Sequence, residues 1–381
     1  MNWSEHNKEV KRVWEAYHAG KPYRIPVMLG VNPRIFLQDP KLNTEHITFQ
    51  QYSEDIDVMI DVQMRFQYYV RHNLYADREM GLPEQGWSVY VDLQNYFEAA
   101  WYGADIIYYE DQVPDCTIIL QDDAKKNMLF HKGLPDPFGG IYTEALRKYE
   151  YIQSQVGKRF YMDVPLGSAG LPSHVIDGIF TAACNLRGTT EFCMDIYEDP
   201  DYAEELLDYV TDATIARLKA WNKRFRGTEK VPGIFFADDS IQLLSKDTYR
   251  DLVLPRHKRL LAELTTGEAP NSFHGCGDVT RHLLTIRDEL HVGEFDTGFP
   301  INHGQLVKDL GPQIRVNGGP HIAVLLGGTP EAVRAETRRI LEEVKPHTGR
   351  FVLRDANNLP PCTPPENVKA MYEAALEYGT F

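Results

Sequence analysis

The sequence predicts an α/β protein that forms a single (β/α)8 (TIM) barrel over residues 1–381, with helical insertions near its N-terminus. Three observations predict this fold. Short β-rich runs alternate with helical runs along the chain, no linker rich in Gly, Pro or Ser divides it, and the strand-like runs number eight. Strands that alternate with helices in one undivided chain are typical of a barrel.

The eight runs are rich in Val, Ile, Phe and Tyr, as strands are. In chain order they are RIPVML (24–29), ADIIYY (104–109), RFYMDV (159–164), GIFFAD (233–238), NSFHGC (271–276), HVGEF (291–295), QIRVN (313–317) and RFVLR (350–354). Helical patterns separate most of them, and a helical insertion, residues 47–69, lies between the first two. A doubly wound open sheet is the alternative, but LGVNPRIF lacks the glycine-rich turn expected after its first strand.

The composition restricts the class of partner. The 381 residues are 43% hydrophobic, and the formal net charge is −15, which argues against a nucleic acid or an anionic membrane surface. The polar N-terminus has no apolar signal core, and no apolar run approaches the ~18 residues of a membrane span. We therefore expect a cytoplasmic protein. Its five scattered cysteines do not predict a disulfide framework.

Polar residues follow nearly every predicted strand, where a barrel of this kind carries its catalytic groups. We predict that four of them serve in proton transfer, substrate contact or metal binding: Asp238, Asp239, Glu294 and Asp296. Five others are predicted substrate contacts: Asn32, Arg34, Asp111, Asn317 and His321. The same pattern is compatible with ordinary loop residues, so it is their convergence on one end of the barrel that favours a site.

The stretch NSFHGCG carries a candidate metal site. His274 and Cys276 are two residues apart, so in a strand their side chains point to the same face. An imidazole nitrogen and a thiolate are ligands that zinc prefers, and a catalytic zinc needs about three protein ligands. The alternative is a core histidine beside a small buried thiol. A third ligand near the pair would decide in favour of a metal site.

Cys362 is the predicted third ligand. Thr363, Pro364 and Glu366 have the pattern of a helix start, with Thr363 as the N-cap. A thiol just outside a helix N-terminus would have a lowered pKa. The alternative is a residue packed under the helix. We interpret the remaining cysteines as packing residues: Cys116, Cys184 and Cys193.

Five segments resemble the uroporphyrinogen decarboxylase superfamily, and more narrowly its branch of cobalamin-dependent methyltransferases. They are residues 11–27, 178–210, 238–261, 318–340 and 363–379. The resemblance covers nearly the whole chain and implies one barrel domain. It also implies zinc, held by a His-x-Cys pair and a distant cysteine, here His274, Cys276 and Cys362.

Two departures from the family pattern bear on the function. The distant cysteine of the methyltransferases aligns near Asn357, five positions before Cys362, so a carboxylate or His321 is an alternative ligand, and absence of zinc is another. The decarboxylases have an Arg-rich segment after the first strand and a closing Gly-His-Gly. This chain has only Arg34 in that segment and RDANNLPP in place of the closing motif, which disfavours a porphyrinogen substrate.

The resemblance therefore implies a zinc-dependent methyltransferase that moves a methyl group between a small substrate and the cobalt of a partner corrinoid protein. The substrate would be a methoxylated compound, a methylamine or a thiol. An aromatic-rich insertion, residues 66–87, could form a lid, and we favour a methoxylated donor. The alternatives are a metal-independent decarboxylase or lyase and a barrel that has lost catalysis. The oligomeric state stays open, with a homodimer as one option.

Overall fold

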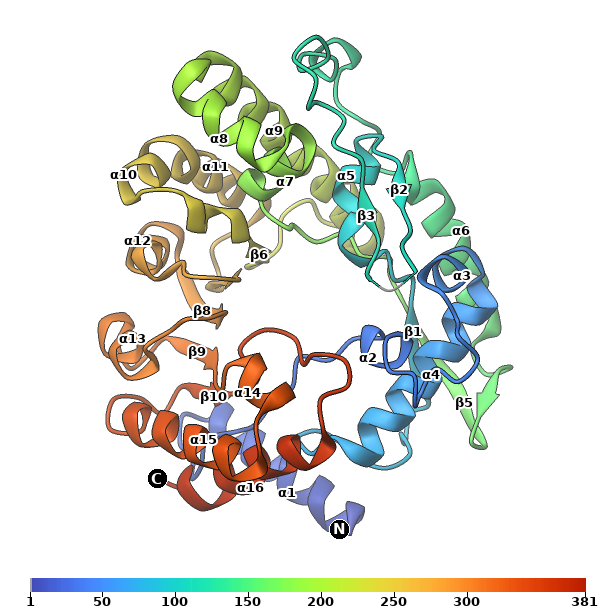
Figure 1. Ribbon diagram of the computed structural model, residues 1–381, viewed down its shortest axis with the longest axis vertical. Helices are drawn as coiled ribbons and strands as arrows, with labels where there is room; N and C mark the ends of the chain where they lie inside the picture. Colours follow the sequence, from blue (N-terminus) through green and yellow to red (C-terminus); the bar gives the residue numbers. More distant parts are fainter. Residues whose placement is uncertain (1, 111) are drawn as a thin grey trace. The chain divides into compact units, whose positions relative to one another are not determined.

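The computed structural model describes residues 2–110 and 112–381 and has an α/β architecture (Figure 1). The chain forms two compact units, each assembled from separated stretches. Unit 1 contains residues 1–90, 151–170 and 294–381, and unit 2 contains residues 91–150 and 171–293. The single-domain organisation stays a prediction. No helix in the described part of the chain is both long enough and apolar enough to cross a membrane.

Unit 1 contains the N-terminal and C-terminal helices. Its helices are α1 (Trp3–His18), α2 (Arg34–Leu37), α3 (Phe49–Glu54), α4 (Ile56–Asn73), α13 (His303–Leu310), α14 (Ile322–Gly327), α15 (Pro330–Val344) and α16 (Pro365–Tyr378). Its strands are β1 (Trp87–Tyr90), β4 (Phe160–Tyr161), β5 (Val164–Gly170), β9 (Arg315–Gly318) and β10 (Phe351–Leu353). Helix α6 (Ile141–Gln155) and strand β8 (Val292–Thr297) cross the boundary between the units.

The paired strands that form the core of unit 1 are parallel. Strand β1 pairs with β5, and β9 pairs with β10 and with the part of β8 that belongs to unit 1. The expected first strand, residues 24–29, runs beside β10, where the Met28 N–H donates to the Leu353 carbonyl over 2.8 Å. It forms only isolated bridges, at Arg24 and at Val27, and Pro26 between them has no N–H to donate.

Two expected strands are wrong as elements of a parallel sheet. The run 104–109 forms only β2 (Ile106–Ile107), which pairs antiparallel with β3 (Asp115–Cys116). The parallel strand in this part of the chain is β1, which begins at Trp87, at the end of the segment expected to be an insertion. Trp87 is fully buried, so burial against the core, rather than the apolar run, selected the strand.

The run 159–164 forms the first arm of a hairpin instead of a parallel strand. Strand β4 pairs antiparallel with the start of β5, and it is β5 that continues as the parallel partner of β1. Met162 and Asp163 occupy the turn with φ of 49° and 60°, as a two-residue hairpin turn of the primed type requires. Asp163 is therefore a turn residue.

Unit 2 contains the central helices. Its α-helices are α5 (Phe97–Trp101), α7 (Ile179–Arg187), α8 (Thr189–Glu198), α9 (Pro200–Arg226), α10 (Lys246–Thr248), α11 (Leu254–Leu264) and α12 (Thr280–Leu290). Its short helices are η1 (Gln94–Tyr96), η2 (Phe130–Lys132), η3 (Asp239–Leu243) and η4 (Tyr249–Val253). Strand β6 (Phe235–Ala237) pairs parallel with β7 (Asn271–Gly275). Helices α7, α8 and α9 pack together (Figure 1).

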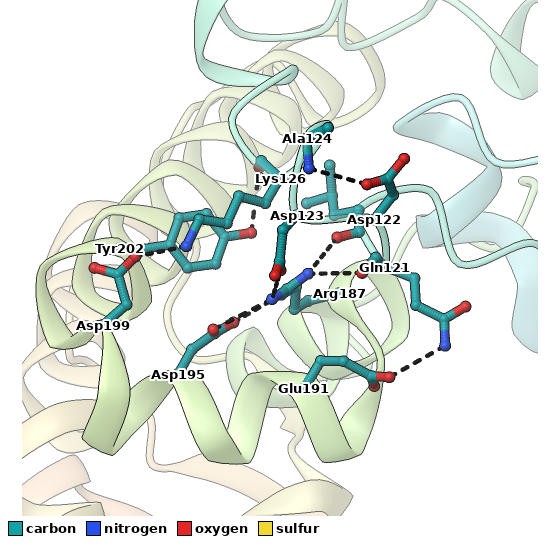
Figure 2. A network of polar contacts seen from close by, with 11 residues as sticks. Gln121, Asp122, Asp123, Ala124, Lys126, Arg187, Glu191, Asp195, Asp199 and Tyr202 are labelled. Atoms are coloured by element: carbon teal, nitrogen blue, oxygen red, sulfur yellow. Dashed lines mark hydrogen bonds and ion pairs between the residues drawn. The ribbon is translucent and has the colours of Figure 1, made fainter.

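Arg187, the last residue of α7, anchors an irregular segment of unit 2 to these helices (Figure 2). Its guanidinium donates to Asp195 on α8 over 2.7 Å, to Asp123 over 2.6 Å and to the Leu120 carbonyl over 2.8 Å. The Tyr202 ring on α9 lies 5.7 Å from it. A planar guanidinium with five donors satisfies these partners together, which ties the segment around Leu120 to α7 and α8.

Candidate metal centre

His274 and Cys276 lie at the carboxyl end of β7 in unit 2. The parallel register places His274 opposite Ala237 of β6. The His274 Nε2 atom is 3.1 Å from the Cys276 Sγ atom, and both residues are partly buried. The Phe235 ring lies 6.4 Å from the His274 ring. The strand end therefore brings an imidazole nitrogen and a thiol sulfur to one point.

Asp239 provides a third candidate ligand atom. Its Oδ1 atom accepts a hydrogen bond from the Cys276 N–H over 2.7 Å and lies 3.8 Å from the His274 Nε2 atom. The ligand atoms of Asp239, His274 and Cys276 all lie within 4.8 Å of one another. Around a tetrahedral zinc with bonds of about 2.0–2.3 Å, ligand atoms lie about 3.3–3.8 Å apart. The residues present therefore fit a zinc ion with an open fourth position.

A tight turn after Cys276 holds this arrangement. Gly277 has a φ of +70°, and a Cβ atom there would lie 1.9 Å from the Gln242 Oε1 atom. Glycine adopts this conformation without strain, whereas most other residues do not. The turn and the hydrogen bond to Asp239 together fix the position of the Cys276 backbone.

Asp177 is a residue of this site that the sequence reasoning missed. It is largely buried, and its burial together with the Glu98 and Asp239 carboxylates raises the pKa of Asp177 to about 8. His274 also acts on it electrostatically. A carboxyl group that keeps its proton near neutral pH is a candidate proton donor. The available signal was its place one residue before the segment that resembles the family, which begins at Gly178.

A buried ion pair positions the backbone of Asp177. The Asp177 N–H donates to the Glu98 Oε2 atom over 3.1 Å. The other carboxylate oxygen of Glu98 accepts from Arg217, which also donates to the Tyr142 hydroxyl over 2.7 Å. Glu98 and Arg217 are both buried and hydrogen-bonded to each other, although the Arg217 Nε atom has no partner among the described residues. The pair therefore holds the segment that carries Asp177.

Asp238, a predicted catalytic residue, is fully buried under the start of α7. Its carboxylate accepts from the Phe180 N–H over 3.0 Å, from the Thr181 N–H over 2.9 Å and from His257 Nε2 over 3.1 Å. The Phe180 and Thr181 N–H groups belong to the first turn of α7, where no carbonyl group of the helix is available to accept their hydrogen bonds. The geometry favours a role in capping α7, one residue from the candidate ligand Asp239.

Glu294 and Asn317, predicted to serve in catalysis and substrate binding, bind each other in unit 1. The Asn317 side chain donates to Glu294 over 2.8 Å, and Arg315 donates to the Asn317 Oδ1 atom over 2.9 Å. Arg315 also lies 3.3 Å from the Glu294 carboxylate. Each polar group thus has a partner within the cluster. Cross-strand pairing accounts for the contacts among these side chains. Their roles in catalysis and substrate binding stay predictions.

Asp296, the fourth predicted catalytic residue, forms an ion pair in unit 1. The Arg354 Nη1 atom donates to it over 2.6 Å, and Arg354 also donates to the Asn357 carbonyl over 2.5 Å. The backbone carbonyl of Asn357, the position where the resemblance expects a cysteine, is therefore bound by arginine. The neighbouring Asp355 is fully buried.

The other predicted substrate contacts are placed as follows. The Asn32 side chain accepts from the Arg34 N–H over 3.0 Å, which closes a local turn before α2. His321 is the N-cap of α14 and accepts from the Ala323 N–H over 2.9 Å. The Phe299 ring lies 3.8 Å from the His321 ring. Asp111 lies outside the described residues. None of these contacts tests substrate binding.

A helix does start beside Cys362, but one residue later than expected and without Thr363 as its cap. Helix α16 begins at Pro365 without a side-chain cap, and the Thr363 hydroxyl instead donates to the Pro360 carbonyl over 2.7 Å. Cys362 is exposed in unit 1 with a φ of 62°, and desolvation together with the nearby Asp39 raises its pKa. The expected lowered pKa is therefore wrong. Among the described residues of unit 2, the cluster of candidate ligands consists of Asp239, His274 and Cys276. Cys362 belongs to unit 1, and its part as the third ligand stays a prediction.

The fold and the cluster define an α/β protein with a three-residue site suited to a zinc ion at a strand end. The family model for uroporphyrinogen decarboxylase (URO-D) matches residues 173–378. The protein belongs to this family, which confirms the resemblance found in the sequence.

Curated relatives include two kinds of enzyme. The chain is 29% identical over 202 residues to the methylated-thiol–coenzyme M methyltransferase of Methanosarcina mazei, covering 52% of this chain and 51% of that one. It is 25% identical over 201 residues to the methylcobamide:CoM methyltransferase of the same organism, covering 53% and 56%. It is 32% identical over 148 residues to the uroporphyrinogen decarboxylase of Nocardia farcinica, covering 39% and 40%.

The match therefore spans about half the length of the first of these relatives. A solved structure of a methyltransferase from Methanosarcina mazei matches 97% of this chain and 98% of its own, with a TM-score of 0.64 and 19% identity. This likeness shows a shared α/β fold. The methyltransferases and decarboxylases among the relatives support an enzyme.

Proposed function

We propose that the protein is a zinc-dependent methyltransferase that moves a methyl group between a small substrate and the cobalt of a partner corrinoid protein. The observation that carries this proposal is the convergence of Asp239, His274 and Cys276. The names of two relatives, a methylated-thiol–coenzyme M methyltransferase and a methylcobamide:CoM methyltransferase, support the class of reaction. We also propose that the parallel strands close into a (β/α)8 barrel, and the likeness to the solved methyltransferase supports that fold.

Each residue of the cluster has a distinct part in the proposed site. His274 and Cys276 present their ligand atoms from one strand end, and Asp239 both offers a carboxylate oxygen and fixes the Cys276 backbone. The Phe235 ring lies beside the His274 ring, with the ring centroids 6.4 Å apart. When bound, zinc would act as a Lewis acid that activates a thiol or a leaving oxygen or nitrogen.

Asp177 completes the proposed chemistry from the side of the protein. Burial raises the pKa of Asp177, which favours the protonated form of its carboxyl group. A neutral carboxyl group adds no negative charge to a cluster that already has Asp239 and Cys276. It can also give its proton to the group that loses the methyl, which suits a methoxylated compound or a methylamine. We keep the methoxylated donor as the favoured substrate class.

Metal analysis of the purified protein tests the proposal. We expect about one zinc per chain in protein prepared without chelator, and loss of most of it in His274→Ala, Cys276→Ser and Asp239→Asn. Cys193→Ser, a thiol change on α8 at a residue that is not in the cluster, is the matched control and should keep the metal. The wild type should methylate reduced cobalamin from 2-methoxyphenol, and the three ligand variants should be at least tenfold slower.

A wild-type protein that holds no zinc after preparation without chelator would contradict the zinc centre. The alternative is a metal-independent decarboxylase or lyase, which the family model and a relative named uroporphyrinogen decarboxylase support. Release of carbon dioxide from a small acid that persists in Cys276→Ser, with no methyl transfer by the wild type, would favour that alternative.

A further inference from the structure

Unit 2 contains a small pocket whose wall has none of the three candidate metal ligands. It has a volume of about 170 Å³ and lies between residues 233–235, where β6 begins, and the C-terminal half of α9. Most of its wall is apolar: Val175, Ile176, Leu218, Ile234, Phe235 and Leu264. A cavity of about 150 Å³ with such walls accommodates one benzene molecule. The pocket therefore has the size and the lining for a single six-membered ring.

His174 gives the pocket a hydrogen-bond acceptor. Its Nδ1 atom lies 2.7 Å from the Pro172 carbonyl, which can only accept, so Nδ1 carries the proton and Nε2 has a free lone pair. The ring stacks on Trp221 at 4.8 Å with an interplanar angle of 8°, which fixes its orientation. Burial lowers the pKa of His174, which keeps the ring neutral. The structure gives Nε2 no hydrogen-bond partner among the described residues.

Arg226 gives the pocket a positive charge. It is the last residue of α9, lines the pocket and forms no ion pair in the described part of the chain. Its guanidinium acts electrostatically on His174, so the two polar groups are near each other. No acidic side chain lines the pocket within the described residues. An apolar pocket with a few convergent polar groups is the usual form of a small-molecule site.

We propose that this pocket binds a single-ring aromatic acid that carries a hydroxyl group. The ring lies between the apolar walls, the carboxylate pairs with Arg226, and the hydroxyl donates to the His174 Nε2 atom. Phe235 belongs to the wall of the pocket and also contacts the His274 ring. The site is separate from the three candidate metal ligands and does not depend on the proposed methyl transfer.

Isothermal titration with 4-hydroxybenzoate, benzoate, phenol and benzylamine tests the chemistry of the pocket. We expect 4-hydroxybenzoate to bind with a stoichiometry of about one and a Kd of about 0.1–1 mM. This Kd is what a modest binding free energy per atom gives for a ligand of about ten non-hydrogen atoms. Benzoate and phenol should each bind about tenfold more weakly, since each lacks one polar contact. Benzylamine should not bind, because its charge has the same sign as Arg226.

Three variants and one control locate the binding. Arg226→Gln should weaken 4-hydroxybenzoate about tenfold and leave phenol unchanged. His174→Phe keeps the stack on Trp221 and should remove the preference for 4-hydroxybenzoate over benzoate. Leu218→Phe should fill the pocket and abolish binding. Arg224→Gln is the matched control, because Arg224 is on the same helix turn but lies over the Phe138 ring at 4.9 Å.

The outcomes separate this proposal from the zinc centre. Cys276→Ser should bind 4-hydroxybenzoate as the wild type does, whether or not it has lost zinc. No binding to the wild type at about 5 mM ligand, which is about five- to fiftyfold above the expected Kd, would overturn the proposal. Binding that survives in Leu218→Phe, or that falls equally in Arg224→Gln and Arg226→Gln, would also overturn it. Thermal unfolding of each variant checks that it is folded.

Discussion

Asp355 shows how burial alone sets the properties of a single side chain. It lies in unit 1 directly after β10 and Arg354, and is fully buried. Its Oδ1 atom accepts from the Gly30 N–H over 2.8 Å, and its Oδ2 atom has no hydrogen-bond partner among the described residues. Desolvation, partly offset by Arg354, raises the pKa of Asp355 to about 7.

This pKa gives a testable prediction for Asp355→Asn. In the unfolded chain the carboxyl group ionises near pH 4, whereas the folded protein keeps its proton up to about pH 7. Folding therefore takes up a proton in this interval, and the wild type loses stability as pH rises from 4 to 7. Relative to the wild type, the free energy of unfolding of the variant should rise by up to about 4 kcal/mol over that interval.

Urea unfolding of both proteins at several pH values measures this difference. Above pH 7 the difference should stay constant, because both states are then ionised. A difference that does not change between pH 4 and pH 7 would contradict a protonated Asp355 in the folded protein.

At the scale of one element, α7 depends on a cap from a distant part of the sequence. The Asp238 carboxylate accepts a hydrogen bond from the Phe180 N–H in the first turn of α7, although Asp238 lies 58 residues later in the sequence. Gly178, the N-cap, has a φ of +122°, and a Cβ atom there would lie 2.5 Å from the Asp238 carboxylate. Glycine is therefore required by both conformation and close approach.

We expect Gly178→Ala to lower the free energy of unfolding by at least about 3 kcal/mol, from backbone strain and displacement of Asp238. Gly227→Ala is the matched control, since Gly227 ends α9 with a φ of +74° and has no atom within 4 Å of a Cβ position. The control should cost only about 1 kcal/mol. Equal losses in the two variants, measured by urea unfolding, would contradict the role of the Asp238 contact.

At the scale of the whole molecule, each unit contains one buried histidine whose pKa burial lowers to about 4: His282 in unit 2 and His303 in unit 1. Neither ring nitrogen of His303 has a hydrogen-bond partner among the described residues. Both histidines are neutral in the folded protein near pH 6, whereas the unfolded chain binds protons below about pH 6.5. Their contribution to stability is therefore present above pH 6.5 and is lost as pH falls to 4.

We expect the protein to lose stability in acid for this reason, with up to about 3 kcal/mol lost for each histidine between pH 6.5 and pH 4. Protonation of Asp355 changes the free energy of unfolding in the opposite direction between pH 6.5 and pH 4. The effect of one histidine is therefore measured by comparing a variant with the wild type. His303→Leu should be about 3 kcal/mol less sensitive than the wild type to the same change of pH. Thermal unfolding across this range measures the slope, and identical slopes would show that His303 is not buried neutral.

Much of the fold followed from local patterns in the sequence. The alternation of β-rich and helical runs predicted the α/β class, and the runs at 233–238, 271–276, 291–295, 313–317 and 350–354 coincide with strands. The runs at 104–109 and 159–164 were misassigned, because an apolar run does not show whether its partner is a neighbouring hairpin arm or a distant parallel strand. Strand β1 was missed because only burial identifies it.

The sequence by itself determined the family, the α/β class and the pair His274 and Cys276, because two residues at spacing two on a strand must share a face. Only the tertiary structure decided what completes the cluster. Asp239 lies 35 residues before His274, and strand pairing between β6 and β7 brings the two together. Asp177 joins them because a buried ion pair holds its backbone. Contacts between residues distant in sequence depend on packing, which local patterns do not encode.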